Sequence, residues 1–166
     1  MKAKAMALTV LVLTVALLAA FIPVTGLAKG NKTYFSGTEC FVETLDLGTM
    51  TELGNGAVHI AGLQQLYEDV TDDPRTTGDS TVVINAILDL NTGTGLFWAP
   101  FEIANAQGGW SGMATGRIDN WMHSMHGVAH GSGAYEGLVG YWTFSQADPD
   151  ACFDVSGYIV ETGAGE

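Results

Sequence analysis

His130-Gly131-Ser132-Gly133-Ala134-Tyr135-Glu136-Gly137-Leu138 lies near the end of a segment, residues 93–140, in which aromatic and small apolar residues alternate with glycines. Glycine inside a helix costs ~1 kcal/mol relative to alanine, so a segment this rich in glycine does not form a stable helix. The same glycines suit a strongly curved antiparallel sheet, where they permit bends, bulges and close strand crossings. The segment therefore predicts an all-β fold, a single small antiparallel barrel.

Alternation of apolar and polar residues divides the chain into about eight expected strands, at the short spacing typical of a barrel or sandwich. The clearest alternation places Val82, Ile84, Ala86, Leu88 and Leu90 on one face of a strand. A proline within the fourth expected strand indicates that this strand lies at the edge of the sheet or contains a bulge. The glycines between the first two strands predict a turn-rich connection. The expected strands cover residues 34–43, 58–70, 81–90, 96–104, 110–121, 122–129, 135–145 and 153–160.

Residues 1–28 have the pattern of an export signal. Lys2 and Lys4 precede an apolar run over residues 5–22, which is followed by Pro23 and the small-residue pattern Gly26-Leu27-Ala28. We expect cleavage after this pattern, a secreted or periplasmic product, and no stable membrane span once the leader is removed. The alternative is an uncleaved anchor, because the apolar run approaches the ~20 residues that span a bilayer. The remaining residues, 29–166, have the length of one domain.

The chain is strongly acidic, with 18 Asp and Glu residues against 6 Lys and Arg and a formal net charge of −12. Nucleic acid is therefore excluded as an expected partner, because phosphate binding needs a basic surface. The acidity is explained by solubility outside the cell, by adaptation to salt, or by recruitment of calcium. The acidic loop from Asp69 to Asp79 lacks the ordered spacing of an EF-hand, so the sequence leaves a calcium site there open.

Cys40 and Cys152 are the two cysteines of the chain. An even count in an exported chain predicts a disulfide between them. The bond would join the first strand to the approach of the last, and these two strands are neighbours in a closed up-and-down barrel.

Neither a metal site nor a nucleophilic site is predicted. His126 and His130 would share one face of a strand and His123 the other, so the three side chains do not converge as zinc coordination requires. Ser111 lacks the Gly-x-Ser-x-Gly frame of a nucleophile elbow. Both cysteines are expected in the disulfide, so neither supplies a thiolate. We expect no metal and no organic cofactor.

Residues 131–140, Gly-Ser-Gly-Ala-Tyr-Glu-Gly-Leu-Val-Gly, resemble the Gly-small-Gly-x-aromatic-Glu-Gly-x-x-Gly signature of allene oxide cyclases. Those proteins share an eight-stranded antiparallel barrel with dirigent proteins and with uncharacterised secreted bacterial barrels. The segments at 72–75, 108–112 and 133–137 are more similar to the bacterial members. The resemblance implies a barrel with an apolar cavity, and it allows a homo-oligomer, with a trimer as the analogous state.

One departure weighs against transferring the cyclase reaction. In the cyclases an early-strand glutamate is followed two positions later by an asparagine that helps to hold a catalytic water. Here Glu43 is followed at that offset by Leu45. Glu43 is kept as a candidate pocket residue, but the cyclase apparatus is incomplete.

Charged residues in two predicted strands offer a second set of candidates. If the Trp98 and Glu102 face of one strand met the Met113 and Arg117 face of the next inside the barrel, an aromatic-walled cavity with an ion pair would result. A desolvated carboxylate there could act as a general base. The alternative is that this face points outward, as antiparallel sheets usually alternate apolar-in and polar-out. Trp121 is a further candidate for ligand contact.

Three functions are compatible with these patterns. The leading interpretation is a secreted barrel that binds a small apolar ligand. The second is a cofactor-free isomerase or cyclase that uses Glu43, Glu102 and Arg117, with the carboxylates as proton acceptors and the guanidinium holding an oxyanion. The third is a structural or self-assembling protein of the cell envelope.

Overall fold

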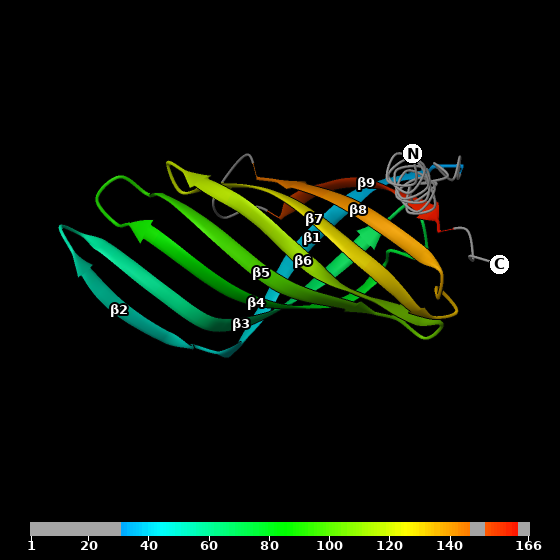
Figure 1. Cartoon of the computed structure of the whole chain (residues 1–166), viewed down its shortest axis with the longest axis horizontal. Coiled ribbons are helices and arrows are strands. Elements are labelled where there is room, and N and C mark those ends of the chain that lie inside the picture. Colours follow the sequence, from blue (N-terminus) through cyan, green and yellow to red (C-terminus); the bar gives the residue numbers. More distant parts are fainter. Residues whose placement is uncertain (1–30, 147–151, 163–166) are drawn as a thin grey trace, which may run out of the picture.

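The computed structural model describes residues 31–146 and 152–162, in which all helical or strand structure is β-strand. The predicted leader lies outside the described residues. Nine strands form a single antiparallel sheet, so the all-β prediction is confirmed (Figure 1). In the described ranges, no helix has the length and apolar character needed to cross a membrane. The strands are β1 (Thr33–Asp46), β2 (Thr49–Gly54), β3 (Ala57–Thr71), β4 (Gly78–Asp89), β5 (Thr94–Ala104), β6 (Gly108–Asp119), β7 (Met122–Gly133), β8 (Leu138–Ser145) and β9 (Phe153–Glu161).

The sheet curves into a barrel-like ring. From β2 to β9 each strand pairs with the next one in sequence, and β1 pairs with β9 on one edge and with β3 on the other. The first and last strands are therefore neighbours, as the cysteine positions predicted. β2 pairs with β3 only, so it lies outside the ring and extends the sheet at one end (Figure 1).

β2 is the main difference from the expected strands, because the sequence analysis assigned this stretch to a turn-rich connection. Its partner is the first part of β3, and the hairpin turn between them is Asn55-Gly56. Both turn residues have positive φ, 53° and 83°. Asn-Gly is the dipeptide that a two-residue type I′ hairpin favours, so this turn was a readable signal for an additional hairpin.

A β-bulge in β3 changes which of its side chains point into the ring. Between Ile60 and Leu63 the strand has two residues opposite the single Asn85 of β4. Gly62 carries the required positive φ of 72°, and its N–H donates to Asn85 Oδ1 at 3.1 Å. Val58 is buried before the bulge, whereas after it Tyr67 is buried, so the inward positions shift from even to odd numbers.

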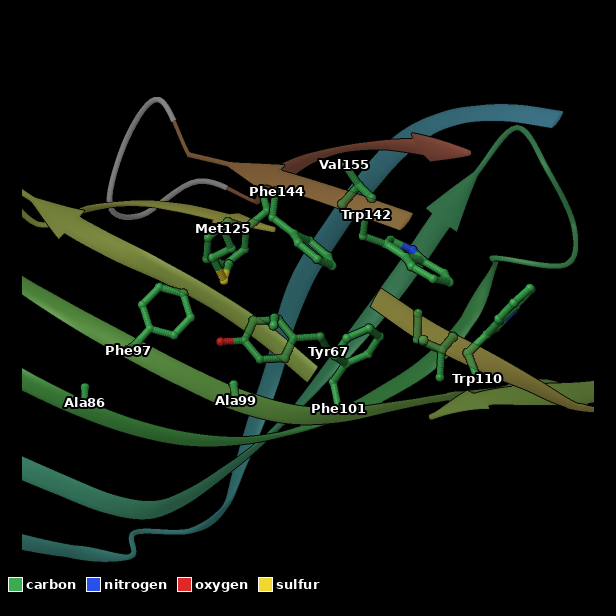
Figure 2. Close-up of a cluster of buried hydrophobic side chains, with 14 of the residues drawn as sticks. Tyr67, Ala86, Phe97, Ala99, Phe101, Trp110, Met125, Trp142, Phe144 and Val155 are labelled. Atoms are coloured by element: carbon green, nitrogen blue, oxygen red, sulfur yellow. The ribbon is translucent and has the colours of Figure 1, made fainter. Parts of the chain in front are cut away.

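One end of the ring is closed by packed aromatic side chains. Trp110 is 2% exposed, and its Nε1–H donates to the carbonyl oxygen of Arg75 at 2.7 Å. Tyr135 stacks on Trp110 with ring centroids 5.5 Å apart, and its hydroxyl donates to Asn105 at 2.8 Å. Trp142 packs edge-on against Trp110 (Figure 2). Tyr135 lies in the β7–β8 turn, three residues before β8 begins, where a strand was expected from Tyr135 onward.

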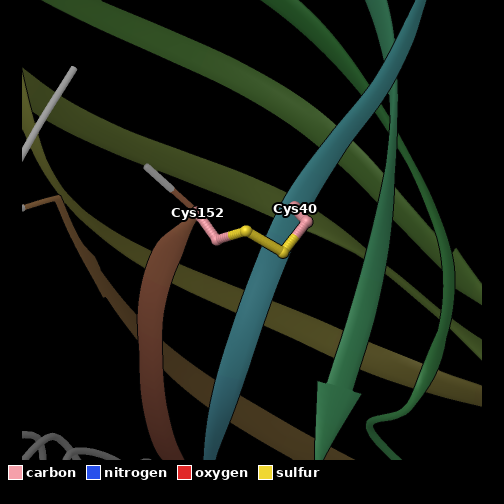
Figure 3. Close-up of a disulfide and its surroundings, with 2 residues drawn as sticks. All are labelled: Cys40 and Cys152. Carbon is pink, nitrogen blue, oxygen red and sulfur yellow. A yellow bond between two sulfur atoms is a disulfide. The ribbon is translucent and has the colours of Figure 1, made fainter. Parts of the chain in front are cut away.

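The predicted disulfide is confirmed. Cys40 on β1 is bonded to Cys152, which directly precedes β9, across a sequence separation of 112 residues (Figure 3). Within the described residues there is no free cysteine. A disulfide is compatible with an extracellular or periplasmic location.

Candidate ligand cavity

The interior of the ring contains a cavity of about 290 Å³. This volume lies at the lower end of the range for small-molecule sites, ~300–1,000 Å³. Most of the lining side chains are aliphatic or aromatic, and they come from every strand of the ring. The lining residues are Glu39, Ile60, Leu63, Gln65, Tyr67, Val82, Ile84, Ala86, Leu88, Phe97, Ala99, Phe101, Ala114, Ile118, Trp121, His123, Met125, Phe144 and Phe153.

The cavity reaches the surface at the end opposite the packed aromatic side chains. Trp121, in the β6–β7 turn, lines the cavity and is 44% exposed. The N–H of Trp121 donates to the carbonyl oxygen of Gly93 at 2.9 Å, which joins two turns at this end. Trp121 also has a positive φ of 68°, unusual for a bulky residue. The turn therefore holds a large aromatic side chain at the mouth.

Small residues on neighbouring strands leave the space that the cavity occupies. Ala99 on β5 is paired with Ala114 on β6, and both are buried. Ala86 on β4 is also buried and, like Ala99, belongs to the buried cluster of the interior (Figure 2). Three methyl side chains on adjacent strands cannot fill the centre of a ring, so the void follows from the sequence at these positions.

Glu39 is the buried carboxyl side chain of the cavity lining, which also contains the polar residues Gln65, Tyr67 and His123. Its residue is only 4% exposed, and its side chain lies near the Ser80 hydroxyl. Tyr67 lies on the neighbouring strand β3, and its hydroxyl donates to Gln65 Oε1 at 2.7 Å. This donation uses the hydroxyl proton of Tyr67 and the amide oxygen of Gln65, so the Tyr67 oxygen is left as an acceptor and the Gln65 amide N–H groups are left as donors.

A second carboxyl group lies directly behind Glu39. Asp69 on β3 is paired with Glu39 in the β1–β3 register and is 1% exposed. Ser80 on β4 is opposite Tyr67 and is fully buried. Neither oxygen of the Asp69 carboxyl group nor the Ser80 hydroxyl has a hydrogen-bond partner. Buried polar atoms are normally paired, so these three groups form an unusual cluster that favours contact with an additional donor.

Burial raises the pKa of both carboxyl groups of the cluster. Burial raises the pKa of Glu39 well above its ordinary value, the nearby Asp69 carboxyl adds to the rise, and the Ser80 hydroxyl offsets part of it. Burial likewise raises the pKa of Asp69 to about 7, again with a smaller opposing effect of Ser80. The pKa of Tyr67 is also raised, by burial and then by Glu39. At neutral pH the cluster therefore holds at least one proton.

Of the residues predicted to contact a ligand, one lines the cavity and two lie on the outer face of the sheet. Trp121 lines the cavity, as expected. Trp98 and Met113 point outward instead and are 37% and 46% exposed. The reason is alternation along the strand: Phe97 and Ala99 take the inward positions on either side of Trp98.

None of the three predicted acid–base candidates reaches the cavity. Glu102 and Arg117 are exposed on the outer face of β5 and β6, which is the alternative that the sequence analysis kept open. Glu43 is also exposed, and the β1–β3 register shifts between Phe41 and Glu43. This irregularity interrupts the inward alternation that continues from Phe35 to Glu39.

The histidines and the acidic loop make other contacts. His123 lines the cavity, and its Nδ1 lies 2.9 Å from Gln146 Oε1, whereas His126 and His130 are exposed on the opposite face. In the acidic loop, Asp73 forms a salt bridge of 2.6 Å with Arg75, which lowers the pKa of Asp73. Across residues 31–146 and 152–162, no three potential metal ligands converge.

Comparison of the chain with protein-family models, with curated proteins and with solved structures found no match. The resemblance to allene oxide cyclases stays a prediction.

Proposed function

We propose that this protein is a secreted binding protein that holds a small, largely apolar molecule inside the strand ring. The proposal depends on the cavity of about 290 Å³, whose lining is mostly aliphatic and aromatic and which has an aromatic residue at its mouth. Apolar ligands gain ~25 cal/mol per Å² of surface removed from water, and a concave site removes most of that surface.

Filling the cavity tests this function. Ala86→Leu and Ala114→Leu each place an isobutyl group where the wild type has a methyl group, so each should lower the affinity for the neutral dye N-phenyl-1-naphthylamine by at least about tenfold. Dye fluorescence measures the binding. Trp98→Ala and Met113→Ala are matched controls on the outer face, and both should retain wild-type affinity. Saturable dye binding that survives both leucine substitutions would contradict a binding site inside the ring.

A second function, self-assembly, is favoured by a separate feature of the outer face. An outer stripe of apolar and aromatic residues crosses six adjacent strands, because each member is paired in register with the next. Two of its rings stack at 4.8 Å. Exposed apolar patches of this kind mark interaction surfaces. The outer stripe consists of Pro100, Met113, Val128, Tyr141, Tyr158 and Tyr34.

If the outer stripe joins copies of the chain, Val128→Lys should reduce the mass measured by size-exclusion chromatography with light scattering from an oligomer to a monomer. A lysine in the middle of an apolar contact leaves a charge that is costly to bury. Thr115→Lys, on the same face but outside the stripe, is the control and should leave the mass unchanged. A wild-type protein that is monomeric at every accessible concentration would rule out this second function.

A further inference from the structure

The buried carboxyl groups at the cavity indicate which kind of ligand head group the site would accept. Glu39 lines the cavity while buried, and Asp69 behind it has two oxygens without a hydrogen-bond partner. The Tyr67 hydroxyl donates a hydrogen bond to Gln65. Once Glu39 is ionised, its carboxylate only accepts hydrogen bonds, so it favours a ligand head group that donates hydrogen bonds and carries a positive charge.

In the part of the chain that the structure describes, the positively charged side chains all lie outside the cavity. Among the described residues the lysine and arginines are Lys32, Arg75 and Arg117. Lys32 lies over the Tyr158 ring at 3.9 Å, Arg75 pairs with Asp73, and Arg117 is exposed on the outer face. An anionic head group such as a fatty carboxylate would meet two buried acids and no cation. Anions are therefore disfavoured as ligands.

Aromatic rings line the same cavity. Tyr67 and Phe153 lie edge to face with centroids 6.2 Å apart, and both line the cavity, as does Phe101. The faces of such rings attract cations. The chain's net charge of −12 also draws cations toward the protein.

We propose that the cavity recognises an amphiphilic amine, whose protonated amino group contacts Glu39 while its hydrocarbon part occupies the apolar space toward Trp121. This inference rests on the proposed ligand-binding function and specifies the head group of the ligand. An ammonium group supplies three hydrogen-bond donors and compensates the charge of an ionised carboxylate.

Binding of an ammonium group is coupled to loss of a proton from the cluster. In the free protein burial raises the pKa values of both carboxyl groups, which favours their protonated forms. A bound cation favours the ionised form, and the proton goes to solvent. Tyr67 on β3 is the titratable group next to the pair, and His123 on β7 also lines the cavity and packs on Phe153. The residue paired with Glu39 on β9 is Phe153, which does not titrate.

Three ligands with the same chain length and different head groups test the proposal: octylamine, 1-octanol and octanoate, each competing with N-phenyl-1-naphthylamine at about pH 8. We expect octylamine to bind at least about tenfold more tightly than octanol, and octanoate to bind most weakly. Glu39→Gln should abolish the preference for the amine while dye binding persists. Glu68→Gln, an exposed position next to Asp69 on β3, should leave the preference intact.

The wild-type protein provides an independent measurement if Glu39→Gln does not fold. Calorimetric titration with octylamine near pH 6, in buffers with different ionisation heats, should report release of about one proton per bound ligand, and octanol should report none. Octanol binding as tightly as octylamine, or amine binding without proton release, would overturn the amine proposal. If the dye still bound, the proposed ligand-binding function of the cavity would not be contradicted by these results. Failure of the dye and of all three ligands would instead reject the proposed binding function itself.

Discussion

Removing the disulfide by the double substitution Cys40→Ser/Cys152→Ser should lower the free energy of unfolding by about 4 to 5 kcal/mol. The bond joins residues separated by 112 positions, so it restricts nearly the whole described chain in the unfolded state. The chain-entropy model assigns an effect of this size to a loop of ~100 residues. Urea unfolding monitored by tryptophan fluorescence measures the change, with the denaturant midpoint and slope compared between the two proteins.

The two cysteines suit this experiment because their replacement should cost little packing. Cys40 is half-buried and Cys152 is exposed, so serine is tolerated at both positions. Adding a reductant to the wild-type protein should reproduce the same loss without any substitution, and it should not change the double variant. A loss below about 1 kcal/mol in both experiments would mean that strand pairing alone holds β1 against β9.

The inward-pointing residues of the central strands could be predicted from the sequence, because strict alternation of apolar and polar residues identifies the apolar set as the inward one. Val82, Ile84, Ala86 and Leu88 were placed on one face of their strand, and all four line the cavity. Leu90, assigned to the same face, lies just past the end of β4 and is 44% exposed.

The carboxyl cluster could not be read in the same way, because a bulge changes the alternation. Continued alternation from the buried Val58 would place Asp69 on the outer face. The extra residue at Gly62 shifts every later inward position by one, so Tyr67 and Asp69 point inward. Glu39 has the same parity as the buried Phe35, which was a usable signal. Its pairing with Asp69 depends on the closure of β1 onto β3, which no local pattern encodes.

The acid–base roles predicted for Glu43, Glu102 and Arg117 also depended on the strand register, which the sequence did not show. A charged residue in an apolar strand can point into the cavity or outward until the register is known. In the structure all three side chains are exposed to solvent. The isomerase interpretation built on these residues therefore has no group inside the cavity.

The stability of the protein should fall as pH rises from about 5 to 7, by roughly 2 kcal/mol from Asp69 alone. Burial raises the pKa of Asp69 to about 7 in the folded state, whereas the unfolded chain ionises near the ordinary value of 3.8. Between these two values the folded protein binds more protons than the unfolded chain, so each increase in pH favours unfolding. The raised pKa of Glu39 acts in the same direction.

Urea unfolding at intervals from pH 5 to pH 8 measures this slope, and the variant Glu39→Gln/Asp69→Asn should abolish most of it because neither replacement titrates. At pH 8 the variant should be more stable than the wild type, since it no longer holds two acids in a buried site. Glu68→Gln and Asp79→Asn, at exposed positions on β3 and β4, are the controls and should keep the wild-type slope. The lowered pKa of Asp73 stabilises the folded state above about pH 4 and is lost only at lower pH, outside this window. A wild-type stability that is flat or rising over the window would show that the two carboxyl groups ionise normally, and that the cluster meets water in the folded protein.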